Sequence, residues 1–146
     1  MQLDIVGKTL TRDKIFDWEN LVKRYEQIEL KVKHIFSHGV YARELYIPAG
    51  VILTGQIHKF ENLNILSKGS MLVSVDGDMI EVTAPFTVVS PPGTKRIAQA
   101  ITDCIWTTIH GTFERDLDII ENCFIAHNEQ KWLEFSNSNQ LELGLH

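Results

Sequence analysis

The residues best placed to do chemistry are two basic side chains, His58 and Arg96, which fall in separate β-rich segments. An arginine binds phosphate or carboxylate through a rigid fork of N–H groups, and a neutral histidine can donate one hydrogen bond and accept another. Neutral polar residues that can orient a ligand accompany them, namely Thr54, Gln56 and Asn62. This set predicts binding of a small anion or a polar ring inside a partly apolar cavity.

Further side chains can extend this site. Lys95, in the loop before Arg96, offers a second positive charge, and Arg43 adds a third if its side of the strand faces inward. Trp106 can stack against a base or a sugar, although aromatic residues in strands are more often part of a core. The structural alternative for Arg96 is a cross-strand ion pair with an acidic residue. Its candidate partners are Glu44 and Glu81.

A second hypothesis is an enzyme that works without a metal. His58 and His110 both lie near the ends of expected strands, where one can act as a general base and the other as an acid. Glu61 is an alternative second group. The triplet His110-Gly111-Thr112 has the HxT spacing of two-histidine phosphoesterases, which need two such triplets, but His58 begins His-Lys-Phe. Turnover of a ligand would separate this enzyme from a binding protein.

The elements that must position these residues are short strands separated by turn residues. The strands are expected over residues 31–36, 40–47, 51–58, 63–66, 71–75, 79–83, 86–89, 96–101 and 104–110. Asp76-Gly77 predicts a two-residue hairpin turn. Side chains alternate along a strand, so one face of the strand at 51–58 is expected to carry Ile52, Thr54, Gln56 and His58. Such a succession without helical crossovers predicts a mainly β sandwich or barrel.

Helices are expected on both sides of this β region. Thr11 or Asp13 can cap a helix of about four turns, and its apolar positions are Ile15, Trp18, Val22 and Tyr25. Helices are also expected over residues 114–126 and 129–135, followed by a loose linker at 136–140. A short strand is possible at 3–6. The alternating leucines of 141–145 can fray or add an edge strand to a neighbouring subunit.

Composition limits the classes of protein to which the chain can belong. The 146 residues are 44% hydrophobic, which suits one domain: an N-terminal helical extension (1–33), a barrel (34–112) and a C-terminal helical tail (113–146). The net charge of -5 argues against a nucleic acid polymer as partner. Cys104 and Cys123 are the only cysteines, and Cys104 is expected to be a buried structural thiol. Without a leader or a long apolar run, a cytoplasmic protein with no membrane partner is expected.

The glycine and proline spacing resembles the two motifs of the cupin superfamily. The first motif, G(X)5HXH(X)3-4E(X)6G, falls on Gly50, Gln56, His58, Asn62 and Gly69. The second, PXG(X)2H, falls on Pro91 to Arg96, so Arg96 stands where the family has its third histidine. The resemblance covers roughly residues 40–112 and implies a jelly-roll β-barrel. Because most metal-ligand positions are replaced, it implies no tightly bound metal or other cofactor unless Glu61 and His110 supply ligands.

The run Pro-Pro-Gly-Thr-Lys-Arg at 91–96, followed by Cys-Ile-Trp-Thr-Thr-Ile-His at 104–110, also resembles small cupin-like proteins carried by tailed phages. This resemblance implies the host cytoplasm as location. It also implies a phosphorylated host metabolite, such as a nucleotide signal, that the protein sequesters or degrades. Cupins usually pair through their sheets, so a homodimer or a larger homo-oligomer is expected. A third hypothesis is a structural or assembly protein whose barrel is filled by its own side chains.

Overall fold

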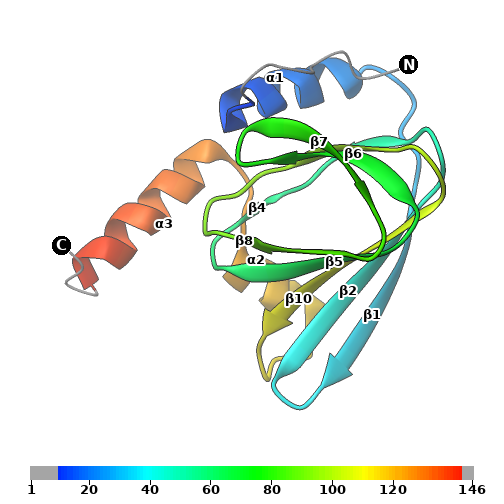
Figure 1. Cartoon of the computed structure of the whole chain (residues 1–146). Coiled ribbons are helices and arrows are strands. Elements are labelled where there is room, and N and C mark those ends of the chain that lie inside the picture. The colour runs from blue at the N-terminus through cyan, green and yellow to red at the C-terminus, as the bar shows by residue number, and fades with distance from the viewer. Residues whose placement is uncertain (1–9, 143–146) are drawn as a thin grey trace.

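Two antiparallel β-sheets face each other in the computed structural model, which describes residues 10–142 (Figure 1). The larger sheet contains, in spatial order, β1 (Lys31–Ser37), β2 (Val40–Ile47), β10 (Cys104–Gly111), β5 (Asn62–Lys68) and β8 (Phe86–Ser90). The smaller contains β3 (Ile52–Thr54), β9 (Ile97–Ala100), β6 (Ser70–Val75) and β7 (Asp78–Thr83). A two-stranded sheet joins β11 (Ile125–Ala126) to β4 (Ile57–His58). The prediction of a mainly β jelly-roll barrel is confirmed.

The inward side chains of both sheets form the main core. Along β5, for example, Asn62, Asn64 and Leu66 are buried while Leu63 and Ile65 are only partly so, as alternation requires. The buried apolar cluster consists of Leu45, Ile47, Leu66, Met71, Val73, Val82, Ala98, Ala100 and Cys104. Cys104 therefore packs as the buried thiol that was expected, and burial raises its pKa.

The hairpin between β6 and β7 confirms the turn predicted at Asp76-Gly77. Val75 pairs with Asp78, which leaves a two-residue loop. Both loop residues have positive φ, 51° at Asp76 and 85° at Gly77. This is the backbone combination of a type I′ turn, whose twist matches that of the flanking strands.

The single strand predicted over residues 51–58 is wrong. The chain forms β3 and then β4, which belong to different sheets. Gly55 lies between them, and its N–H donates to the Arg96 carbonyl at 2.8 Å. Because the strand is interrupted, the simple alternation fails: Ile52 packs with Ile97 on the outer side of the sheet, while Leu53 and Thr54 both face the interior cavity.

The first helix, α1 (Arg12–Val22), covers the outer side of the smaller sheet (Figure 1). Thr11 caps it by accepting the Lys14 N–H, as predicted, and Ile15 is buried against Ile97. The helix is shorter than expected because it ends before Tyr25, whose side chain is exposed.

Two helices follow the barrel strands. α2 (Leu117–Phe124) is shorter than the predicted 114–126 because Asp116 caps it by accepting two N–H groups of its first turn. The predicted linker at 136–140 is wrong, since α3 (Glu129–Glu142) continues through it. The predicted strand at 3–6 and most of the leucine tail lie outside the described residues. Among described helices, none is long and apolar enough to cross a membrane.

The beginnings of α1 and α3 meet over the Pro-Pro-Gly loop that precedes Arg96. Arg12 donates two hydrogen bonds of 2.8 Å to the Glu129 carboxylate and a third, of 3.2 Å, to the Gly93 carbonyl. Trp132 packs directly against Gly93. Elements from both ends of the described chain therefore hold the loop from which Arg96 enters the barrel.

Candidate functional site: a cavity with one polar side

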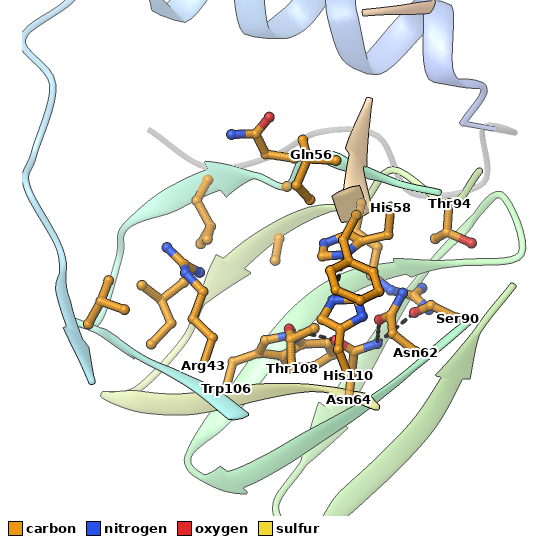
Figure 2. Close-up of a pocket in the computed structure, with 18 of the residues that line it drawn as sticks. Arg43, Gln56, His58, Asn62, Asn64, Ser90, Thr94, Trp106, Thr108 and His110 are labelled. Atoms are coloured by element: carbon orange, nitrogen blue, oxygen red, sulfur yellow. Dashed lines mark hydrogen bonds between the residues drawn. The ribbon is translucent and has the colours of Figure 1, made fainter. Parts of the chain in front are cut away.

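The barrel encloses a cavity of about 630 Å³ between its sheets. Apolar residues form much of its wall: Leu30, Val32, Leu45, Ile47, Leu53, Met71, Val73, Ala98 and Trp106. Figure 2 shows His58, His110, Asn62, Asn64 and Ser90 gathered on one side, with Arg43 and Trp106 on the other. The helix α2 adds Leu117, Ile120, Glu121 and Phe124 to the wall. Such a volume and mixture suit a small molecule with an apolar part and a polar part.

The two candidate catalytic histidines are in direct contact. His58 Nδ1 lies 3.1 Å from His110 Nε2, and the two rings stack with centroids 5.1 Å apart. Phe124 of α2 stacks on the other side of His110 at 4.7 Å. Burial, with the nearby charges, lowers the pKa of His58 to about 4, and burial also lowers the pKa of His110. Both rings are therefore neutral at pH 7.

The hydrogen bond between the rings has a preferred direction. His110 is 5% exposed, and its Nδ1 is buried without a hydrogen-bond partner among the described residues. A buried N–H without a partner is rarer than an unused lone pair. We therefore assign the His110 proton to Nε2, which donates to His58 Nδ1, so His58 carries its own proton on Nε2. His110 is therefore bonded to His58, and it is His58 that keeps an N–H for a ligand. The two rings do not face a ligand from opposite sides.

Arg96 is a half-buried cation on the cavity wall. Its guanidinium donates to the Ser74 carbonyl at 2.7 Å and to Ser90 Oγ at 2.6 Å. Burial lowers its pKa. No ion pair forms with Glu44 or Glu81, both within the described chain. The expected pairing fails because Glu44 alternates with the inward residues of β2 and Glu81 is exposed on β7.

A buried network of polar side chains contacts Arg96 through Ser90. Asn64 Nδ2 donates to Asn62 Oδ1 at 2.9 Å and to Ser90 Oγ at 2.7 Å. Thr108 Oγ1 donates to Asn64 Oδ1 at 2.8 Å. Sequence reasoning selected Asn62 but missed Asn64, Ser90 and Thr108. Alternation along β5 and β10 could have found two of them, since Asn64 shares a face with Asn62, and Thr108 with Trp106 and His110.

Of the other predicted site residues, some line the cavity and some do not. Thr54, Gln56, Arg43 and Trp106 line the cavity, although Gln56 and Arg43 are exposed and the Thr54 hydroxyl bonds to Glu19 of α1. Glu61 is exposed and does not line the cavity.

Lys95 does not line this cavity either. Its ammonium lies 3.0 Å from Glu19 and donates to the Gly55 carbonyl at 2.7 Å. Burial opposes ionisation of Glu19, but hydrogen bonds from Thr54 and Lys95 leave its pKa lowered. Lys95 thus fastens α1 to the barrel, and Lys23 adds a second, exposed charge near Glu19.

The residues present do not fit the metal that the cupin motif carries. Within the described residues there is no group of three histidine, cysteine, aspartate or glutamate side chains that could hold a metal ion. A zinc-type site needs three or four such ligands around one point. Here His58 and His110 direct nitrogens at each other, and Arg96 places a cation in the third histidine position.

Solved structures share this arrangement of strands, among them an RmlC-like cupin. An RmlC-like cupin from Shewanella frigidimarina superposes with a TM-score of 0.52 at 22% identity, covering 64% of this chain and 86% of that one. KdgF from Halomonas sp. gives 0.51 at 15%, covering 64% and 90%. No protein-family model and no curated protein matches the chain. At these identities the likeness concerns architecture alone, and it agrees with the motif spacing: the chain has the fold of the cupin superfamily.

Proposed function

We propose that the protein binds a small anionic molecule in the barrel cavity without a tightly bound metal. The observation that supports this most is the state of Arg96, a half-buried guanidinium on the cavity wall that forms no ion pair with a carboxylate of the described residues, although the charge of Asp76 acts on it. Burial still lowers its pKa, so the desolvated cation is only partly compensated, and an anionic ligand in direct contact would offset that cost. Arg43, at the exposed side of the cavity, adds a second guanidinium.

The remaining wall favours a ligand that is larger than a simple ion. A cavity of about 630 Å³ with a broad apolar wall has room for a ring or a short chain beside the anionic group. A phosphorylated metabolite such as a nucleotide signal meets this description, either sequestered or degraded in a host cytoplasm. A cavity of this volume weighs against a barrel filled by its own side chains.

The test is replacement of Arg96 by alanine. We expect the Arg96→Ala variant to bind adenosine monophosphate at least about tenfold more weakly in calorimetric titration, because a charge-assisted bidentate contact is lost. Arg24→Ala, which removes an equal charge from an exposed position after α1, is the matched control. Unchanged affinity in Arg96→Ala would contradict the proposal. Mass spectrometry of small molecules that copurify with the wild-type protein would identify the natural ligand.

A metal-free enzyme is the second candidate, because His58 and His110 are in contact on the cavity wall. In that case His58, positioned by His110, exchanges a proton with the bound ligand. Incubation with a phosphodiester, followed by analysis of the recovered compound, separates the two functions. An enzyme returns product, and its activity is lost in His58→Ala. A binding protein returns the compound unchanged.

We also propose that the protein is a homodimer that pairs through the outer side of its larger sheet. Cross-strand partners Ile35, Ala42, Ile109, Leu63 and Val89 form a continuous apolar row across all five strands of the sheet. Ile35 and Val89, at its two ends, are 38% and 52% exposed. A second copy would bury this row.

A further inference from the structure

The hydrogen bonds of the buried network run in a single direction, fixed by a backbone carbonyl. The side-chain amide of Asn62 donates to the Phe60 carbonyl at 3.1 Å, and a carbonyl can only accept. Asn62 must therefore turn its Oδ1 toward Asn64, whose Nδ2 donates a hydrogen bond to it at 2.9 Å. With both amides fixed, Asn64 Oδ1 faces Thr108, whose hydroxyl must donate.

This direction ends at Ser90. Ser90 Oγ accepts one hydrogen bond from Asn64 and another from Arg96, at 2.7 Å and 2.6 Å. A serine hydroxyl has two lone pairs and one hydrogen, so both acceptor positions are filled. Its own O–H then needs an acceptor, and none exists among the described residues. Ser90 is 3% exposed and lines the cavity (Figure 2). Leaving a buried O–H without an acceptor costs free energy, so the Ser90 hydroxyl is free to donate to a molecule that occupies the cavity.

We infer that the Ser90 hydroxyl and the Arg96 guanidinium form an oxyanion subsite for a group that carries no proton, such as a carboxylate, a sulfate or a phosphodiester. This inference rests on the proposed anion-binding function and names the chemistry of its polar end. Both groups can only donate to the ligand, because the Ser90 lone pairs are committed and a guanidinium never accepts.

Neither group of this subsite can accept a hydrogen bond from the ligand, because both lone pairs of Ser90 Oγ are filled and a guanidinium has none. The side-chain oxygens of Asn62 and Asn64 each already accept one hydrogen bond within the network. The only carboxylate on the described cavity wall, Glu121, is exposed on α2. A protonated phosphate would bring an O–H that lacks an acceptor, and such a mismatch is strongly rejected by buried sites. The subsite should therefore discriminate between oxyanions by their protonation.

Sulfate and inorganic phosphate test this prediction, since near neutral pH sulfate carries no proton, whereas phosphate carries one and gains a second as the pH falls. We expect wild-type protein to prefer sulfate by about tenfold or more at about pH 6, and to keep a smaller preference at about pH 8, where both anions carry two charges but only phosphate has an O–H. Both affinities are measured at the same pH, so titration of the protein cancels in their ratio, which isolates the ligand's own protons. Equal affinities at both pH values would overturn the inference.

Variants test Ser90 itself. Ser90→Ala should weaken sulfate binding by about tenfold, while Ser90→Thr, which keeps the hydroxyl, should restore most of it. Thr87→Val is the matched control, because it removes an exposed hydroxyl from the same strand, β8, at a position that does not line the cavity. It should change sulfate affinity less than threefold, with thermal unfolding used to confirm that each variant folds.

A crystal structure of the sulfate complex separates a direct contact from an effect through Arg96. We expect a sulfate oxygen within about 3 Å of Ser90 Oγ and another at the Arg96 guanidinium. Sulfate on Arg96 with Ser90 Oγ out of reach would overturn the subsite while leaving anion binding intact. If wild-type protein binds neither sulfate, phosphate nor adenosine monophosphate, the proposed function fails, and the subsite with it.

Discussion

At the scale of single residues, the histidine pair shows how burial changes the chemistry of a side chain. An isolated His58 would be partly protonated near neutral pH, but burial and a second ring at 3.1 Å hold it neutral. A histidine with a pKa of about 4 is a weak base. In the proposed anion-binding site it would act as a fixed N–H donor, and a bound anion would raise its pKa by favouring the charged form.

This gives a testable dependence of stability on pH. In the unfolded chain His58 has an ordinary pKa of about 6.5, whereas in the folded protein the value is about 4. As the pH falls through this interval the unfolded state takes up the proton first, so the folded state loses stability. The full stability is present above about pH 6.5, and about 3 kcal/mol of it should be lost by about pH 4. His110 acts in the same direction.

Urea denaturation at several pH values measures this loss. The His58→Asn variant should show a clearly smaller drop in the free energy of unfolding between about pH 7 and about pH 4. His34→Asn, at an exposed position on β1, is the matched control and should behave like the wild type. Identical pH profiles for wild type and His58→Asn would show that His58 is not held neutral by the fold.

At the scale of elements, the site depends on how the two terminal helices hold the loop before Arg96. Arg12 of α1 joins Glu129 of α3 and the Gly93 carbonyl, and Trp132 lies against Gly93. Gly93 is required for two reasons. Its φ is +86°, and a Cβ there would lie 2.5 Å from the Trp132 ring. The glycine of the cupin motif here makes room for an element outside the barrel.

Replacing this glycine tests the packing of α3. Gly93→Ala should lower the free energy of unfolding by about 2 to 4 kcal/mol, the sum of backbone strain and the clash with Trp132. Gly50→Ala is the matched control, since Gly50 also has a φ of +86° but a Cβ added there would have no atom within 4 Å. It should cost only the strain, about 1 to 2 kcal/mol. Equal losses for both variants, measured by urea denaturation, would mean that Trp132 does not constrain the loop.

At the scale of the whole molecule, the outer sides of the two sheets differ in how their apolar residues are buried. The outer side of the smaller sheet is covered by α1, with Ile15 buried against Ile97. The larger sheet carries the apolar row from Ile35 to Val89, and both of these end residues are exposed. A row of this kind, extending to both edges of a sheet, suits a two-fold interface in which each strand meets its own symmetry mate.

Sedimentation can test the proposed dimer. Ile35→Glu should shift the protein from dimer to monomer at micromolar concentration, because it places a charge in the apolar row. Ile101→Glu is the matched control: Ile101 is similarly exposed, at 44%, but lies in the turn after β9. A wild type that sediments as a monomer, or an Ile35→Glu variant that remains a dimer, would remove this interface.

Sequence patterns predicted much of the barrel because they are local. Alternation and turn residues place most strands within a residue or two of their observed bounds, and Thr11 marks the start of α1. Predictions from local sequence patterns failed where contacts with distant elements determine the structure. After Gly55 the chain leaves β9, and β4 pairs with β11 from the far end of the barrel region. The helix α3 runs through a stretch whose composition suggested a linker.

For the site, sequence alone determined that a cupin-like barrel carries Arg96 and His58 where metal ligands usually stand. Only the tertiary structure decided what those residues contact. His58 and His110 are 52 positions apart, and Lys95 meets Glu19 across 76 positions. Alternation tells which face of a strand a side chain takes, but the partner across the barrel depends on register and helix docking, which are set by long-range packing. That is why the buried network ending at Ser90 emerged from the fold and not from the motif.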